Sequence, residues 1–235
     1  MKDRSSHATL RRAVSRFRDA GNAIGFARLA WTAPRWLIRR EYLVTVKELT
    51  GPLPAISPLP DVTWQRLTDT DLPRLLASSP TLCRTELSRR RQQGQECWVG
   101  WIGDTAAHWR WETQREAYLP YLRRSVRPLD GDLWVVDVYT HPRYRRRGLY
   151  TAATVMAMHR ARARGHTRLI GLIAGWNRPA LRVAETRLQR PVVGTVGYWT
   201  VGPWRPPIVT GSVRLDEGGR VFVPRAGAPS TLRSA

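Results

Sequence analysis

The sequence predicts an α/β protein with a mixed, mostly antiparallel central sheet flanked by helices and preceded by a helical extension. Two apolar runs that meet at Gly103-Asp104 predict an antiparallel hairpin early in the chain. Strand-like and helix-like segments alternate later, which indicates strand–helix units. With 42% apolar and 24% charged residues among 235, the composition is that of a folded globular protein.

Residues 1–50 predict a basic helical extension that ends in a strand. Apolar residues recur between arginines up to about Ile38, and Tyr42–Val46 has strand character. Two interpretations of the helix stay open: packing on the domain, or peripheral contact with an anionic membrane. Residues 51–60 are rich in proline, which predicts a linker before a main domain over residues 61–208.

The main domain is predicted to alternate strands and helices. Capping residues Thr68–Asp71 start a helix, and Gly165 closes a long one. The predicted strands are Val62–Leu67, Cys97–Ile102, Thr105–Trp111, Leu133–Thr140, Arg168–Ala174 and Val192–Val201. One predicted helix ends at Leu76, and three more span Thr85–Gln93, Leu149–Arg164 and Pro179–Leu188. Residues 209–235 predict a hairpin over Ser212–Val223 and a flexible tail.

The formal net charge of +21 indicates an anionic partner. Only two of the 39 basic residues are lysines, and the others are arginines. The excess is uneven: residues 51–139 are neutral, whereas residues 140–190 carry 12 basic side chains and one acidic side chain. Nucleic acid is disfavoured because no nucleic-acid motif accompanies the charge. Two cysteines, no export signal and no apolar span long enough for a membrane favour a cytoplasmic protein.

The segment Thr140–Tyr150 joins a strand to a helix with almost no loop. Such a junction presents unpaired backbone N–H groups at a helix N-terminus, and Gly148 lets another group approach them. Three arginines precede this glycine, so the segment predicts a site for a polyphosphorylated small molecule. The Walker and dinucleotide glycine patterns are absent, and no histidine has partners at metal-ligand spacing.

The pattern Arg145-x-x-Gly148-x-Tyr150, between a strand and a helix, resembles the pyrophosphate loop of the GCN5-related N-acetyltransferase (GNAT) superfamily. The later helix start at Asn177 resembles that family too, and the resemblance is strongest over Val136–Leu188. It implies an acyl-CoA-dependent acyltransferase that uses acetyl-CoA as co-substrate and acts on an amine by direct attack. The acceptor is not identified, and a homodimer and a non-catalytic acyl-CoA-binding module are alternatives that stay open.

The resemblance also implies roles for individual residues. One strand would part from its neighbour and leave backbone groups free for acyl-pantetheine, and the following loop amides would hold the pyrophosphate. The coenzyme-binding residues implied are Val138, Tyr139, Thr140, Arg145, Arg146, Arg147, Gly148, Leu149, Tyr150, Thr151 and Asn177.

The chain departs from the family pattern at the catalytic acid. Ala184 stands where many members place a tyrosine that protonates the departing thiolate, and Leu188–Pro191 replaces the usual Leu-Gly-Phe ending. We therefore expect Tyr198 as a substitute acid. Asp137 is the first candidate base, with an ordinary ion pair as its alternative interpretation.

The remaining acidic and aromatic candidates are weaker. Glu112 and Glu116 follow the second hairpin strand and are secondary candidates for the base. The tryptophans of the predicted strands are expected to pack in the sheet rather than to line an acceptor pocket.

Overall fold

The computed structural model describes residues 39–79, 82–200 and 205–225. Its main sheet has the strand order β10-β9-β1-β8-β7-β4-β3-β2, and β7–β8 is its parallel pair among antiparallel ones. The strands are β1 (Arg39–Glu48), β2 (Thr63–Arg66), β3 (Glu96–Ile102), β4 (Thr105–Thr113), β7 (Asp132–Thr140), β8 (Arg168–Ala174), β9 (Val192–Trp199) and β10 (Pro207–Gly211). The predicted mixed, mostly antiparallel sheet is confirmed.

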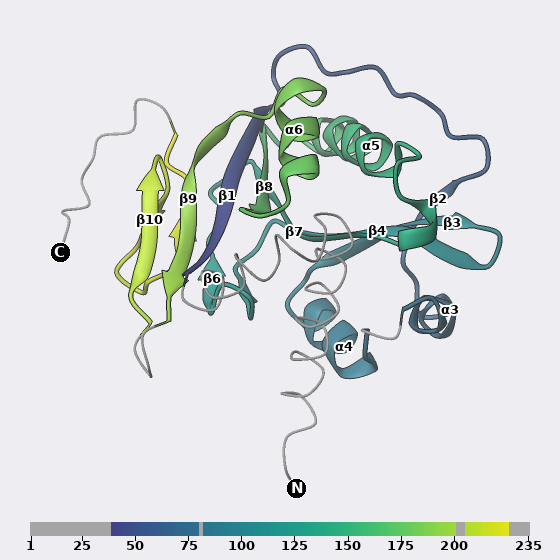
Figure 1. Cartoon of the computed structure of the whole chain (residues 1–235), viewed down its shortest axis with the longest axis horizontal. Helices are drawn as coiled ribbons and strands as arrows, with labels where there is room; N and C mark the ends of the chain where they lie inside the picture. The colour runs from purple at the N-terminus through teal and green to yellow at the C-terminus, as the bar shows by residue number, and fades with distance from the viewer. Residues whose placement is uncertain (1–38, 80–81, 201–204, 226–235) are drawn as a thin grey trace, which may run out of the picture.

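Helices cover both faces of this sheet (Figure 1). One face carries α5 (Leu149–Ala163) and α6 (Arg178–Thr186), and the other carries α3 (Leu72–Ala77) and α4 (Arg84–Gln92). A 3₁₀ turn, η1 (Pro142–Tyr144), precedes α5. Met158 and Leu169 are fully buried under α5, whereas Trp109, Trp111 and Trp134 are fully buried on the α3–α4 side. The expected packing role of the strand tryptophans is thereby observed at these positions.

Strand β1 lies inside the main sheet, between β8 and β9. Its residues were expected to end the N-terminal extension, outside the main domain. Tyr42, Val44 and Val46 alternate along one face and are buried in the larger core, so the strand needs neighbours on both edges. The proline-rich segment after β1 crosses the α5–α6 face (Figure 1), where the carbonyl of Pro54 bonds to His159 of α5.

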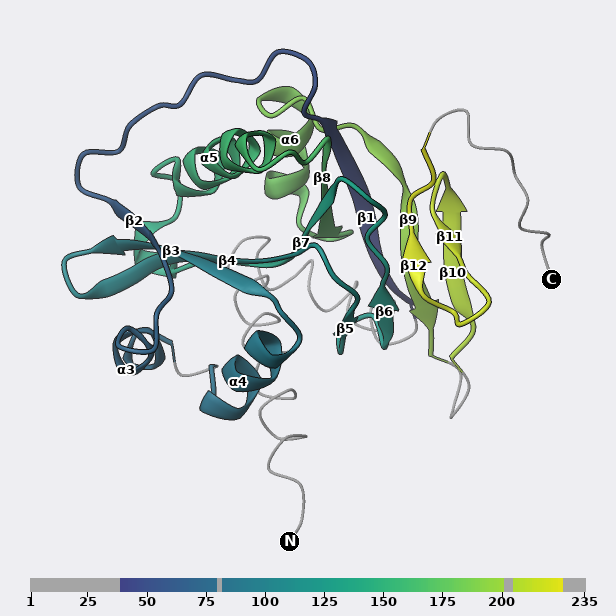
Figure 2. The same cartoon turned by 180° about the vertical axis from the view of Figure 1, so that it is seen from behind.

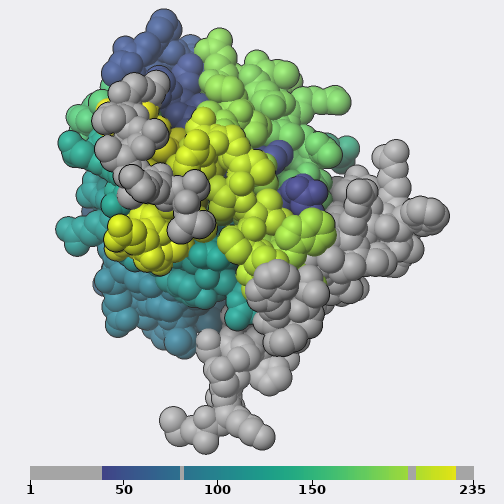
Figure 3. All heavy atoms as spheres, turned by 90° about the vertical axis from the view of Figure 1, so that its left-hand side faces the viewer, coloured from purple at the N-terminus to yellow at the C-terminus, as the bar shows by residue number. Residues whose placement is uncertain are grey.

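A second, small sheet contains two strands from the segment predicted as a hairpin, Ser212–Val223, whereas its other two strands were not expected from the sequence. It has the order β11-β12-β6-β5, with β5 (Ala117–Leu119), β6 (Arg124–Val126), β11 (Arg214–Leu215) and β12 (Val221–Phe222), and is visible from behind in Figure 2. The C-terminal strands cover one end of the molecule, shown in yellow in Figure 3. Arg168, buried in an ion pair with Asp132 at 2.8 Å, also donates to the carbonyls of Val223 and Pro224. This network ties the C-terminal segment to the main sheet.

The predicted N-terminal helix and the predicted flexible tail fall on residues 1–38 and 226–235, outside the described residues. Within the part of the chain that the structure describes, no helix is both long and apolar enough to cross a lipid bilayer.

Candidate functional site

Strands β7 and β8 part halfway along their length. They pair in parallel from Asp132 opposite Arg168 to Val135 opposite Gly171, and the pairing ends there. On its other edge β7 stays paired with β4 as far as Thr140. In the described structure, the backbone of residues 138–140 therefore has a strand on one edge only, as the resemblance implied for a strand that binds acyl-pantetheine.

A β-bulge in β7 lies at the point where the strands part. Trp111 of β4 opposes Asp137 and the next residue, Glu112, opposes Val135, so Val136 is an extra residue. The bulge shifts the alternation of side chains: Asp137 contacts α4, whereas Val138 packs against the core under α5. The strand therefore presents a carboxylate to the α4 side of the sheet and an apolar side chain to the α5 side.

The loop after β7 has the geometry of an anion site. Arg146 and Gly148 both adopt positive φ angles, 63° and 79°, so their neighbouring amides turn toward one concave side. Gly148 is the N-cap of α5, and the first intrahelical bond runs from the Ala152 amide to the Gly148 carbonyl at 2.9 Å. A Cβ on Gly148 would meet no atom within 4 Å. The space beside Gly148, at the N-terminus of α5, is therefore open.

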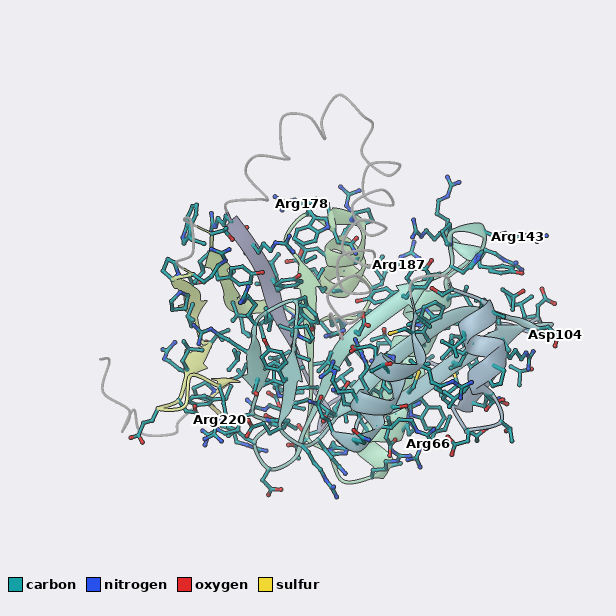
Figure 4. All side chains as sticks on the ribbon, turned by 90° about the horizontal axis from the view of Figure 1, so that it is seen from below. Arg66, Asp104, Arg143, Arg178, Arg187 and Arg220 are labelled. Atoms are coloured by element: carbon teal, nitrogen blue, oxygen red, sulfur yellow. The ribbon has the colours of Figure 1, made fainter. Side chains whose placement is uncertain are left out.

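Arginines surround this loop. Arg145 donates to the Thr140 carbonyl at 3.2 Å, and Arg147 lies 3.5 Å from Asp61. Arg143, Arg178 at the start of α6 and Arg187 just after its end are exposed (Figure 4). The surface around the start of α5 is therefore strongly positive.

Asn177, which the resemblance also implied in coenzyme binding, is the N-cap of α6. Its Oδ1 accepts from the Ala180 amide at 3.3 Å. The described structure thus shows a capping role for this side chain and places it at the end of β8, beside the parted strands.

Asp137, the first candidate base, is buried and ion-paired. Its Oδ2 lies 3.0 Å from Nη2 of Arg90, a buried residue of α4 that also bonds Glu86. Burial alone would lower the pKa of Arg90, but Asp137 and Glu86 outweigh it and raise that pKa. The ion pair that the sequence left as an alternative is therefore present.

The weaker candidates are both held in ion pairs. Glu112 opposes Val135 of β7 and is buried on the α5 side between Arg110 and Arg160, at 2.8 and 2.7 Å. Glu116 is on the surface and pairs with Arg220. The carboxylate of Glu112 is thus close to the parted strands, whereas that of Glu116 is not on β7, β8 or α5.

Tyr198, the expected substitute acid, is buried on β9. It pairs there with Arg40 of β1 and Pro207 of β10. Since β1 and β8 lie between β9 and β7 in the sheet, Tyr198 is not brought to the point where β7 and β8 part.

An aromatic group on the α4 side was missed from the sequence. Tyr121, between β5 and β6, donates to the Val136 carbonyl at the bulge. Its ring lies 4.9 Å from that of Tyr42, which in turn lies 5.8 Å from that of Trp176. No local pattern marks Tyr121, because its contacts are with residues distant in the chain. These rings and Asp137 line the face opposite α5.

A cavity of about 330 Å³ lies elsewhere, between β2, β3 and α4. Its lining includes Arg66, Arg91 and Cys97 but no residue of β7, β8 or α5. Cys97 is buried there. Among the described residues no cluster of His, Cys, Asp or Glu could hold a metal ion.

Residues 124–188, which include β7, the loop, α5 and α6, match the model of the Acetyltransferase (GNAT) family. No curated protein matches the chain in sequence. Three similar solved structures are a GCN5-related N-acetyltransferase from Sphaerobacter thermophilus, another from Kribbella flavida, and an aminoglycoside acetyltransferase from an uncultured soil metagenomic sample.

The likenesses to these structures are distant. Sequence identities are 14%, 16% and 12%, the matches cover 73%, 71% and 54% of this chain, and TM-scores are 0.49, 0.45 and 0.39. The matches cover 54%, 61% and 86% of the three other chains. This chain therefore spans about half the length of the Sphaerobacter protein.

Proposed function

Residues 124–188 of this chain belong to the GNAT acetyltransferase family, and on that premise we propose that the protein transfers an acetyl group from acetyl-CoA to an amine. The observation that carries the proposal is the combination of parted strands and an open helix N-terminus within one segment. The backbone groups of residues 138–140 line one side of the gap between β7 and β8, and the amides that follow Gly148 lie where this gap opens.

The geometry supports a division of roles along the coenzyme. The loop amides at Arg146 to Thr151 would hold the pyrophosphate, where the helix dipole contributes about 0.3 to 1 kcal/mol per charge at an exposed site. The exposed arginines of the loop and of α6 would attract the phosphates. The edge of β7 that faces away from β4 would hydrogen-bond the pantetheine arm and direct the thioester toward the bulge.

At the bulge, proximity would supply much of the catalysis. Holding an amine about 3 to 3.5 Å from the thioester carbonyl can contribute several kcal/mol. Asp137 remains the candidate base because it follows the bulge and precedes the coenzyme-binding backbone. Its ion pair with Arg90, at 3.0 Å, holds the carboxylate in this position.

Calorimetry with acetyl-CoA tests the coenzyme assignment. We expect heat of binding and a raised melting temperature, because a ligand that binds only the folded state stabilises it. No binding at millimolar acetyl-CoA, together with an unchanged melting temperature, would reject the proposal.

A second candidate function is a non-catalytic acyl-CoA-binding module. It is favoured by one observation, the fully buried Ala184, which offers no hydroxyl at the position of the family's acid. This alternative predicts acetyl-CoA binding without release of coenzyme A in the presence of a broad panel of amines. Release of coenzyme A that depends on one class of amine would exclude it.

A further inference from the structure

A buried arginine stands at the point where β7 and β8 part. Arg190, between α6 and β9, is 2% exposed, and its Nη2 lies 2.8 Å from Oγ1 of Thr45. A Cβ added to Gly171 would overlap that same Nη2. Since Gly171 is the last β8 residue paired with β7, the guanidinium occupies the vertex of the parted strands.

Arg190 has no carboxylate partner within the described residues. The partners identified for it are hydroxyl groups, those of Thr45 and Tyr150, and its Nε has none. Burial lowers the pKa of Arg190, and burial also lowers that of the neighbouring Arg110 to about 10. The nearby carboxylate, Glu112, is shared between Arg110 and another arginine. An uncompensated buried cation is unfavourable, so this position stabilises negative charge that forms on a neighbouring group.

Tyr150 connects this cation to the coenzyme loop. It is the second residue of α5, two positions after Gly148, and packs against the core under α5 that also receives Val138 and Val183. Arg190 donates a hydrogen bond to its phenolic oxygen. Because that oxygen accepts from the guanidinium, its own O–H remains able to donate.

We propose that Tyr150 is the proton donor to the departing thiolate of coenzyme A and that Arg190 is the positioning residue that holds it. The inference rests on the proposed acetyl transfer. It explains how the chain can lack a hydroxyl at Ala184: the proton donor comes from α5 instead of α6, and the buried cation at the vertex stabilises it.

The proposed step is balanced within the site. The amine lone pair adds to the thioester carbonyl carbon, and the tetrahedral adduct collapses with cleavage of the C–S bond. The sulfur keeps the electron pair of that bond and takes the Tyr150 proton, giving the free thiol. The attacking nitrogen gives its proton to Asp137, and water returns that proton to the phenolate, which is hydrogen-bonded to Arg190.

The test needs no acceptor: the thiol of bound coenzyme A is titrated by the ultraviolet absorbance of its thiolate, with the protein alone as baseline. A hydrogen bond from Tyr150 favours the thiolate, so the bound thiol in the wild type has a lower pKa than free coenzyme A. In Tyr150→Phe, with coenzyme A at a concentration that saturates the variant, we expect this pKa to rise by about one to two pH units. The matched control is Tyr118→Phe, at a side chain 43% exposed on β5, and should leave the thiol pKa unchanged.

Variants of Arg190 test its positioning role. Arg190→Met should raise the thiol pKa as much as Tyr150→Phe does, whereas Arg190→Lys, which keeps a cation, should recover part of the shift. A purely structural arginine would leave the thiol pKa of the folded variants at the wild-type value.

Three outcomes overturn the inference. An unchanged thiol pKa in Tyr150→Phe, with coenzyme A still bound, rejects Tyr150 and leaves the proposed function standing. A shift in Tyr198→Phe but not in Tyr150→Phe assigns the donor to Tyr198. Failure of the wild type to bind coenzyme A rejects the proposed function and this inference together.

Discussion

Helix α5 offers an internal comparison that separates binding from folding. Gly148 before its first turn and Gly165 after its last have φ angles of 79° and 84°, and a Cβ at either would meet no atom within 4 Å. Alanine at either position thus causes no overlap, but it forces a non-glycine residue into the left-handed region, which costs about 1 to 2 kcal/mol. For a chain of this size, we expect both Gly148→Ala and Gly165→Ala to lower the melting temperature by about 2 to 8 °C.

Binding should distinguish the two variants. Alanine at Gly148 places a methyl group in the space that the proposed pyrophosphate would occupy, whereas Gly165 lies at the far end of the helix. Losing one charge-assisted hydrogen bond, worth about 1.5 to 3 kcal/mol, would weaken acetyl-CoA binding about 10- to 150-fold in Gly148→Ala alone. Calorimetry on both variants measures this difference. Equal affinity in the two variants would show that the loop before α5 does not hold the coenzyme.

Three further predictions concern stability. Asp137→Asn should lower the free energy of unfolding in urea by about 3 to 5 kcal/mol, because it leaves Arg90 buried without one of its carboxylates. The double variant Asp137→Asn/Arg90→Met removes both partners of the ion pair. If it recovers stability but not acetyl transfer, Asp137 is the base; if it recovers both, Asp137 has a structural role only. Burial, together with a nearby arginine, lowers the pKa of His108 to about 3, so the unfolded chain binds a proton below about pH 6.5 that the folded chain rejects. The free energy of unfolding therefore falls as the pH is lowered from 6.5 toward 3. Between pH 7 and pH 5, His108→Asn should lose about 2 kcal/mol less of this free energy than the wild type does. Equal losses in the two proteins would refute the assignment. Ending the chain at Gly211 removes three buried valines and the carbonyl partners of Arg168, and should lower the free energy of unfolding by more than about 4 kcal/mol; an unchanged urea midpoint would contradict this.

The long, regular elements could be predicted from the sequence because their signals are local. Strand β8 has the bounds expected from its apolar run, and α5 ends one residue before the expected Arg164, at the glycine that closes it. The loop at Gly148 was also predictable, since the strand, the glycine and the helix are contiguous. The three-residue strands β5 and β6 carry too little periodicity to be predicted. The equally short β11 and β12 lie within the hairpin predicted over Ser212–Val223, because the glycines between them mark a turn.

The buried position of Arg190, the bulge at Val136 and the contacts of Tyr121 could not be predicted, for a different reason. Arg190 looked like one more basic residue after a helix, and only the packing of α6 over Gly171 shows that its guanidinium is buried. Likewise, the bulge at Val136 depends on the register with β4, and the Tyr121 hydrogen bond to that residue joins segments 15 positions apart across two sheets. Pairwise contacts of this kind leave no trace in composition or spacing.

The place of β1 between β8 and β9 has a consequence for how the protein is made. Thr45 bonds to the carbonyl of Gly171, 126 positions later, so β1 emerges from the ribosome long before either neighbour exists. At about 5 to 20 residues per second, this interval lasts about 6 to 25 seconds. Throughout it both edges of β1 are unpaired, and a sheet dominated by such distant pairings closes slowly. The strand that ends up enclosed in the finished sheet is, during synthesis, an open edge that other chains can pair with.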